Sequence, residues 1–302
     1  MSLPNIGNVL YHLVAGARNA LFDQGELAQL TYGAFDVVAN NVASNKEPVI
    51  EISFPVGYRP DKTSIVSTRN YTKEQLLGRY QLLAFQQMPV NGLGQLVTIT
   101  EALLGDIVRN VIIRYPQKLG AKRAIQLQVV LEAESLEEVH RRATDALLNE
   151  LSYKSPAEFS EALDNLLSIN LLECFAFHKY IELKATRDIY VHNRGIVNET
   201  YLKKAGSHSR ARVGQLLPVD ISYFLESYEA CLQLTEWLDQ VLDQHWHSSD
   251  RETAHELAIQ QTTTPPPLSE PPTPSLAVSF ESLPSSAPVK KRHRPRKKSV
   301  DK

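Results

Sequence analysis

Hydrophobic and polar residues repeat with a helical period over most of residues 70–248. Apolar positions recur at steps of three and four residues, which places them on one face of a helix. The clearest run is 93–115, which ends at Pro116 and carries apolar residues at Leu96, Ile99, Leu103, Ile107 and Val111. The same pattern predicts helices at about 72–88, 134–151, 170–192 and 218–247, and another that begins at 155.

Residues at the expected helix ends support these boundaries. Thr72 precedes the first helix, and Pro89 is expected to stop it because proline lacks a backbone N–H. Ser155, Pro156 and Glu158 combine an N-cap serine, a proline at the first helical position and a capping-box glutamate. The pattern therefore predicts separate helices joined by short connections.

Two stretches depart from the helical period. Residues 49–58 read as a strand, and apolar residues alternate in 124–131, although a helical turn also fits the second stretch. We therefore expect an all-α fold, an up-and-down helical bundle with minor strand-like N-terminal elements. The expected domains are an N-terminal extension of unclear role at 1–70, the bundle at 71–248 and a disordered tail at 249–302.

The tail has a composition of its own. From Thr262 it is rich in Pro, Ser and Thr, which bury too little apolar surface to fold. Residues 288–302 hold eight Lys or Arg and one Asp, whereas the rest of the chain holds 24 basic and 33 acidic residues. A polyanion would therefore be contacted locally, in a pocket or by the tail. The basic tip fits a solubilising end, a tether to RNA or a nuclear-import sequence.

Overall composition indicates an ordinary globular protein, with 43% hydrophobic and 22% charged residues. The only cysteines, Cys174 and Cys231, cannot form a disulfide framework and read as reduced thiols. No signal peptide is recognisable at the start, and no run approaches the roughly 18 apolar residues of a membrane span. These features predict a cytoplasmic protein with no membrane partner.

Residues 171–195 carry the most candidate chemistry. Six residues of this stretch share one helical face, namely Leu171, Cys174, Phe175, His178, Ile181 and Ala185. Asn193 and Gly195 follow, and both tolerate the left-handed backbone that ends a helix. Arg187, Asp188 and His192 therefore stand near the end of a helix that packs against a core.

The spacing of Arg187 and His192 imposes a geometric condition. Residues five apart on a straight helix point about 140° away from each other. A site therefore needs a break in the helix, or a second copy packed by two-fold symmetry that gathers both motifs in one cleft. The spacing alone carries little information, because 17 arginines and 9 histidines give about 1.5 such pairs by chance.

The three residue types suit RNA cleavage. An imidazole exchanges protons near neutral pH, so His192 can act as an acid or base. The Arg187 guanidinium can hold a phosphate and stabilise its extra charge in the transition state. Asp188 can orient either group. RNA supplies its own nucleophile, the 2′-hydroxyl, so the expected reaction needs no metal or cofactor and yields a cyclic phosphate and a 5′-hydroxyl.

Residues 185–198, Ala-Thr-Arg-Asp-Ile-Tyr-Val-His-Asn-Arg-Gly-Ile-Val-Asn, closely resemble the motif of the HEPN superfamily, and the resemblance extends over about 70–245. It implies a helical bundle, a homodimer that joins the two motifs and metal-independent endoribonuclease activity, common in toxin–antitoxin and antiviral phage-defence systems. Arg187 and His192 match the catalytic pair, and Asp188 matches the polar position beside the arginine.

The resemblance leaves two further points. Toxins silenced by nucleotidylation carry a tyrosine where this chain has Arg194, so that control is not expected. Many superfamily members have lost catalysis, so a catalytically inactive module for RNA binding or protein dimerisation remains the alternative. An antitoxin or defence-system protein is the implied partner besides RNA, and a regulatory adaptor that recruits others through its tail is a third interpretation.

A basic segment follows the motif and is a candidate RNA contact. Its cations would bind phosphates and its tyrosine would stack on a base. The predicted RNA-binding residues are Asn193, Arg194, Tyr201, Lys203, Lys204, Arg210 and Arg212. A solvated loop between two helices is the alternative interpretation.

Other motifs lack essential parts. Cys174 and His178 are only two ligands, and His245, His247 and His255 have no carboxylate or cysteine at fixed spacing, so no metal site is predicted. Residues 90–94 resemble a phosphate loop without its Lys-Ser/Thr. No Gly-x-Ser-x-Gly elbow occurs in the chain.

Overall fold

The computed structural model describes residues 4–119 and 127–255. They belong to one unit, because the chain divides between Leu257 and Ala258. Residues 249–255 are helical, so the unit extends past the boundary expected at 248. The Pro-rich segment and the basic tip of the predicted tail lie outside the described residues.

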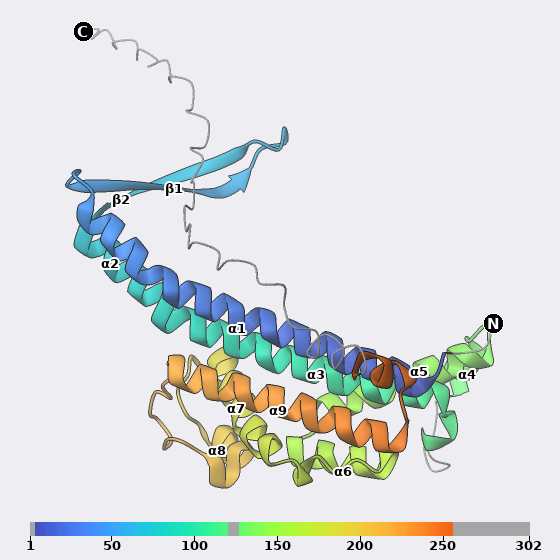
Figure 1. The fold of residues 1–302 in the computed structure, drawn as a ribbon. Coiled ribbons are helices and arrows are strands. Elements are labelled where there is room, and N and C mark those ends of the chain that lie inside the picture. Colours follow the sequence, from blue (N-terminus) through green and yellow to red (C-terminus); the bar gives the residue numbers. More distant parts are fainter. Residues whose placement is uncertain (1–3, 120–126, 256–302) are drawn as a thin grey trace, which may run out of the picture. The chain divides into compact units, whose positions relative to one another are not determined.

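Helices make up most of the described chain, which confirms the all-α class (Figure 1). The elements are α1 (Ile6–Ser44), β1 (Val49–Tyr58), β2 (Ser64–Thr72), α2 (Lys73–Leu82), the π turn η1 (Leu83–Gln87), α3 (Met88–Arg114), the 3-10 turn η2 (Pro116–Leu119), α4 (Leu127–Leu131), α5 (Leu136–Ser152), α6 (Pro156–Leu167), η3 (Leu171–Glu173), α7 (Phe175–Asn193), α8 (Glu199–Ala205), η4 (Gly206–His208) and α9 (Ile221–His245).

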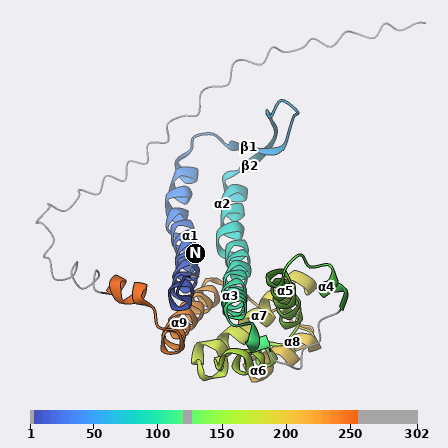
Figure 2. The ribbon, with the colours of Figure 1, turned by 90° about the vertical axis from the view of Figure 1, so that its right-hand side faces the viewer.

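The domain boundary expected at residue 70 is wrong, because helix α1 packs against the bundle. It runs beside α3 (Figures 1 and 2), and it also packs on α9. Its buried residues Leu10, Val14 and Leu21 belong to the same hydrophobic core as the buried residues of α3, α7 and α9. Residues 6–44 are therefore part of the bundle and not an extension of it.

The start of α1 is also joined to the end of the described chain. A Cβ on Gly7 would collide with the backbone carbonyl of His247, so glycine lets the two segments approach closely. The Asn8 amide donates to Asp250 over 2.8 Å, and its carbonyl oxygen accepts from Ser248 over 3.0 Å. These bonds connect the helical residues 249–255 to the bundle.

Pro89 does not stop a helix as expected, because a π turn precedes it. The Met88 N–H donates to the Leu83 carbonyl five residues earlier, and α3 follows without interruption. A wider turn shifts the hydrogen-bonding pattern, so the missing N–H and the bulk of proline are accommodated at the start of α3. One continuous helical rod, α2-η1-α3, replaces the two helices predicted.

The two strands form an antiparallel hairpin. β1 covers the predicted strand 49–58, and β2, which the pattern did not reveal, pairs Thr72 with Val49 and Ser64 with Tyr58. The strand interpretation of 124–131 is wrong where the structure describes it, because 127–131 form helix α4. Residues 124–126 lie outside the described residues.

The sequence-predicted caps at Thr72 and Ser155 are both present as full capping boxes, with Gln75 and Glu158 as the reciprocal partners. Helix α3 lies at the centre of the core, since it packs against α1, α5, α6, α7 and α9. Leu96, Val97 and Ile107 of α3 are completely buried. The core thus fixes α7, the helix that carries the motif, against α3 and α9.

Candidate active site

Helix α7 continues through the whole motif. It is helical from Phe175 to Asn193, so no break separates Arg187 from His192. The left-handed residues that end it are Arg194 (φ 53°) and Gly195 (φ 78°), one position later than expected for Asn193. A Cβ on Gly195 would lie 3.0 Å from the Tyr190 ring, so this exit requires glycine.

Arg187 is fixed by two carboxylates. Its Nη2 lies 2.7 Å from Glu101 Oε2 of α3, and its Nη1 lies 3.3 Å from Asp188 Oδ1. Asp188 also accepts from Lys204 Nζ of α8 over 2.8 Å. Arg187 and Asp188, which the sequence already placed side by side, thus form an ion-pair cluster with Glu101 and Lys204.

Lys184 completes this cluster one turn earlier on α7. Its ammonium contacts the second oxygen of Glu101, so one carboxylate serves both Lys184 and Arg187. The pKa of Lys184 is lowered to about 8, mainly by burial; Asp188 opposes this shift, and neighbouring Arg187 and Lys204 contribute to it. The cluster therefore concentrates positive charge in a partly buried place.

His192 lies apart from this cluster. Its side chain is exposed, and no hydrogen bond or ion pair to it is found within residues 4–119 and 127–255. It stands one turn after Asp188 on the same side of α7. Within one chain the structure therefore joins Arg187 and Asp188 but does not bring His192 to Arg187.

Apolar side chains are exposed at and after the end of α7. Val191 is 63% exposed, and Leu216 is 62% exposed. Ile196 pairs with Leu216 in an isolated antiparallel bridge. The segment that follows α7 therefore lies beside the segment that precedes α9. We call Val191, Ile196 and Leu216 the exit patch.

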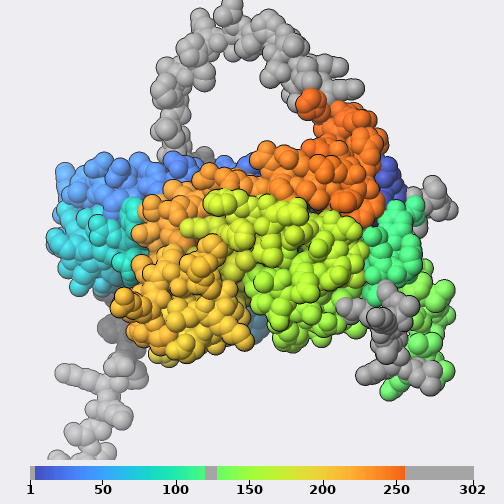
Figure 3. All heavy atoms as spheres, turned by 90° about the horizontal axis from the view of Figure 1, so that it is seen from below, coloured from blue at the N-terminus to red at the C-terminus, as the bar shows by residue number. Residues whose placement is uncertain are grey.

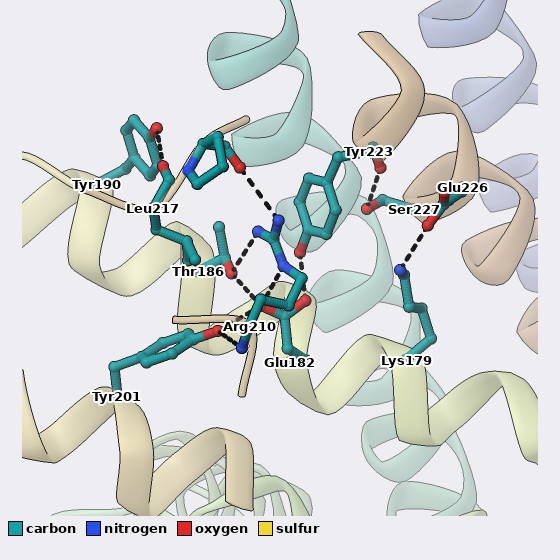
Figure 4. A network of polar contacts seen from close by, with 11 residues as sticks. Lys179, Glu182, Thr186, Tyr190, Tyr201, Arg210, Leu217, Tyr223, Glu226 and Ser227 are labelled. Atoms are coloured by element: carbon teal, nitrogen blue, oxygen red, sulfur yellow. Dashed lines mark hydrogen bonds and ion pairs between the residues drawn. The ribbon is translucent and has the colours of Figure 1, made fainter. Parts of the chain in front are cut away.

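A second polar cluster lies deeper, around Glu182 of α7 (Figure 4). Glu182 is only 2% exposed. One of its carboxylate oxygens accepts from Thr186, Tyr201 and Arg210 at 2.6, 2.8 and 3.0 Å, and the other accepts from Tyr223 at 2.6 Å. The buried charge is thus paired with a cation and completely hydrogen-bonded.

Arg210 anchors the segment after α8 to this cluster. Its guanidinium carbon lies 3.5 Å from the centroid of the Tyr223 ring, and its Nη1 donates to the Pro218 carbonyl over 3.1 Å. Its backbone N–H donates to the Tyr201 hydroxyl. Tyr201 is 1% exposed, so in this conformation it is not available to stack on a base, whereas the Arg210 side chain is 25% exposed and its guanidinium is engaged by Glu182 and Tyr223.

The remaining predicted RNA contacts divide into two groups. Lys204 is half-buried beside Asp188, and the amide of Asn193 donates to the Ile196 carbonyl over 2.5 Å. Arg194, Lys203 and Arg212 are exposed. Lys203 belongs to α8 and Arg212 to the segment after it, and the surface of these parts lies next to that of α6 (Figure 3).

Glu101, Lys184 and Glu182 were missed by sequence reasoning. Glu182 shares its helical face with the buried Ala185, Thr186 and Ile189. A carboxylate on an apolar face was the available indication of a buried charge. Glu101 had none, because its contact with Arg187 joins residues 86 positions apart.

Three further features of the described part of the chain concern metal ligands, thiols and membrane-spanning helices. Within it, no group of three or more His, Cys, Asp or Glu could hold a metal ion. Cys174 and Cys231 are buried free thiols, and burial raises the pKa of Cys231 to about 12. No helix of residues 4–119 and 127–255 has the length and apolar character to cross a membrane.

Comparison with known proteins provides no relative from which to transfer a function. No family model matches the chain, and no curated protein or solved structure matches it. The resemblance to the HEPN superfamily therefore depends on the motif in residues 185–198 and on the helices around it.

Proposed function

We propose that this chain is a metal-independent endoribonuclease of HEPN type that acts as a homodimer. The observation that carries the proposal is on helix α7. The Arg187 guanidinium is fixed by two carboxylates, and the exposed His192 imidazole that follows has no hydrogen bond or ion pair to any described residue. These are the two groups that cleavage by the 2′-hydroxyl requires.

Arg187 is the phosphate-binding group in this proposal. A guanidinium has five N–H donors, and the contacts with Glu101 and Asp188 use only one Nη atom each. The carboxylates hold the side chain in one orientation, so little freedom is lost when a phosphate arrives. The remaining donors stabilise the charge that builds up on the phosphate oxygens.

His192 carries the proton. The imidazole takes the proton from the 2′-hydroxyl as O2′ attacks phosphorus, and an imidazolium gives a proton to O5′ as the P–O5′ bond breaks. The products are a 2′,3′-cyclic phosphate and a 5′-hydroxyl. Two copies of the motif supply two imidazoles, one for each transfer.

The exit patch provides the contact between copies. Val191, Ile196 and Leu216 are exposed apolar residues at and after the end of α7, the helix that carries His192. A two-fold contact at this patch would bury these side chains and bring the two His192 imidazoles into one cleft. The exposed Arg194, Lys203 and Arg212 would then contact the RNA backbone on either side. A role in a toxin–antitoxin or defence system, with an antitoxin as inhibitor, agrees with such an activity.

A specific observation favours a second candidate, a catalytically inactive module that binds RNA or dimerises. In one chain Arg187 is engaged by two carboxylates, and His192 does not reach it. The same arrangement is expected in a protein that kept the surface for RNA binding or dimerisation and lost its catalytic activity.

Cleavage of total RNA in excess EDTA tests the first candidate. We expect His192→Ala to reduce the rate by about 10²–10⁴-fold, the usual contribution of general acid–base catalysis. His245→Ala is the matched control, because His245 is also exposed in the last turn of a long helix. Equal rates for wild type and His192→Ala, or no cleavage by the wild type, would favour the inactive module.

A further inference from the structure

A groove of about 410 Å³ lies between the β1–β2 hairpin and the rod formed by α2 and η1. Figures 1 and 2 show the hairpin beyond the ends of α1 and α2, whereas α7 lies among the helices of the bundle. No residue of the motif at 185–198 lines this groove, which we call the hairpin groove. It is therefore a feature separate from the candidate active site.

The wall on the hairpin side is one face of the sheet. Ile52 lies directly opposite Arg69 in the strand register, and directly opposed residues share a face. Phe54 and Tyr71 each stand two residues further along their strands, so they lie on that face too. All four line the groove, and the rod contributes the other wall through Leu76, Arg79, Tyr80 and Leu83.

The groove carries positive charge that no neighbour cancels. Its lining contains two arginines, Arg69 and Arg79, and no carboxylate. Both arginines are exposed, and neither forms an ion pair within residues 4–119 and 127–255. Glu51 is next to Ile52 in the chain, but the alternation of a strand places it on the other face. Two uncompensated guanidiniums favour an anionic ligand.

The same groove presents planar surfaces. Phe54, Tyr71 and Tyr80 are partly exposed there, and the two tyrosine hydroxyls make no hydrogen bond to any described residue. The Arg69 guanidinium carbon lies 5.0 Å from the centroid of the Phe54 ring, so this planar cation covers a ring and offers a further surface for stacking. Aromatic rings and arginine planes are the groups on which unpaired bases stack.

A ligand must use both kinds of group. A simple anion would leave the rings uncovered, and an uncharged apolar ligand would leave the arginines without a counter-charge. A single strand of nucleic acid supplies a planar base and a phosphate in every nucleotide. An acidic peptide supplies the negative charge, but it carries a planar ring only where an aromatic residue happens to occur.

We propose that the hairpin groove binds single-stranded nucleic acid, with bases stacked on Phe54, Tyr71 and Tyr80 and phosphates paired with Arg69 and Arg79. That the strand is RNA rests on the proposed function, for which the groove holds the substrate at a distance from the cleaved bond. Binding at the groove does not use the motif on α7, so it is measured without cleavage.

The test is fluorescence anisotropy of the full chain with a labelled single strand of 2′-O-methyl RNA, which lacks the nucleophile for cleavage. We expect saturable binding, and at least about tenfold weaker binding of the same strand paired with its complement, because paired bases are not free to stack on side chains. Absence of single-strand binding, or equal binding of the duplex, would overturn the proposal.

Charge variants locate the phosphate contacts. Arg69→Gln combined with Arg79→Gln should weaken binding at least about tenfold and make the dependence of log affinity on log salt shallower by about 1.4, at about 0.7 for each phosphate contact. Arg59→Gln combined with Lys62→Gln is the matched control, because these exposed cations of the same hairpin lie outside the lining. Equal losses in both pairs would assign the affinity to net charge and refute the groove.

Ring variants test the stacking. Tyr80→Leu should weaken binding at least about fivefold with an unchanged melting temperature of the free protein. Tyr58→Leu is the matched control, since Tyr58 is 72% exposed on the hairpin and outside the lining. The effect of Tyr80→Leu should vanish with an abasic strand, which keeps the phosphates and lacks the bases. The same loss with the abasic strand, or no loss with the complete strand, would contradict stacking.

These results are distinct from the outcome of the cleavage assay. Groove-dependent binding by a chain that cleaves no RNA would support the groove and count against the nuclease. Cleavage with an affinity that ignores the groove variants would do the reverse, and would leave the groove to a protein partner.

Discussion

At the scale of single residues, Glu182 determines how the motif is held. A carboxylate that is 2% exposed needs a cation and donors, and here four side chains converge on it. Two of them, Tyr201 and Arg210, come from the segment after α7. The same contacts that satisfy the charge therefore fasten this segment to the helix one turn before Arg187.

Removal of the cation should be costly. We expect Arg210→Met to lower the free energy of unfolding by about 3–5 kcal/mol, because it leaves an uncompensated buried charge. Arg212→Met, which changes an exposed arginine two residues later, should stay within about 0.5 kcal/mol of the wild type. Urea unfolding followed by circular dichroism measures both. A similarly small loss of unfolding free energy in both variants would contradict a stabilising role of the Arg210–Glu182 pair.

The tyrosines of this cluster should limit stability at high pH. Burial raises the pKa of Tyr201 to about 12 and also raises that of Tyr223; in both cases the Glu182 carboxylate contributes. A tyrosine in the unfolded chain titrates near 10. Above pH 10 the folded state therefore binds more protons than the unfolded state, and stability falls as the pH rises.

We expect the urea midpoint to fall steadily from about pH 10 to pH 12, through the folded-state pKa of Tyr201. Ultraviolet absorbance should show these tyrosines ionising together with unfolding. Complete titration of all tyrosines near pH 10 without loss of helical ellipticity would contradict the expectation.

At the scale of elements, close helix contacts depend on particular glycines. A Cβ on Gly92 of α3 would lie 2.5 Å from the Phe224 ring of α9, whereas a Cβ on Gly94 of the same helix would meet nothing within 4 Å. The two positions differ in packing and share the same helix. They form a matched pair for substitution.

Gly92→Ala should lower the free energy of unfolding by about 1–3 kcal/mol through overpacking of α3 against α9. Gly94→Ala should raise it by about 0.5–1 kcal/mol, because alanine favours the helix and open space surrounds the position. Thermal unfolding of the two variants is the measurement. A gain in stability for Gly92→Ala would show that α9 can move away at little cost.

The same contacts explain how much of the fold could be predicted from the sequence. Helices with a dense apolar face, such as 93–115, were predicted because their pattern is local. Helix α1 was missed, since its glycines lower helix propensity, and two of them, Gly7 and Gly25, are explained only by neighbours on or just after α9. The prediction that Pro89 ends a helix was wrong for a similar reason, because it is the preceding π turn that lets the helical rod continue through this proline.

The candidate site shows the same division. The Arg187–Asp188 pair and the helix exit at Gly195 follow from local chemistry and were predictable. Glu101 and the hairpin groove were not, because they depend on the packing of α3 against α7 and of the hairpin against α2. Tyr201 read as an exposed stacking residue, since no local pattern indicated that its hydroxyl would bond to Glu182.

At the scale of the whole molecule, the proposed nuclease requires two copies. Arg187→Ala and His192→Ala each remove one half of the pair, but a mixed dimer contains an intact arginine in one chain and an intact histidine in the other. If the site is shared across the two-fold axis, the mixed dimer keeps one arginine and one of the two imidazoles in the cleft. Co-expressed variants purified through two different tags should therefore cleave RNA more slowly than the wild type but at least about tenfold faster than either variant alone.

Two results would contradict a shared site: a mixed dimer as inactive as both parents, or sedimentation of the wild type as a monomer at the concentrations that cleave RNA. Arg187→Lys is a useful companion variant, since it keeps the charge beside Glu101 and Asp188 while losing the planar fork of donors.

The bonds between the start of α1 and residues 248–250 bear on how the protein is made. Asn8 and Asp250 are 242 residues apart in the chain, so at roughly 5–20 residues per second a ribosome needs roughly 10–50 s to pass from one to the other. During that time α3 can cover one side of α1, but the side that receives α9 has no partner. The nascent chain thus presents an apolar helix face for most of its synthesis, and this face is where a chaperone would bind it.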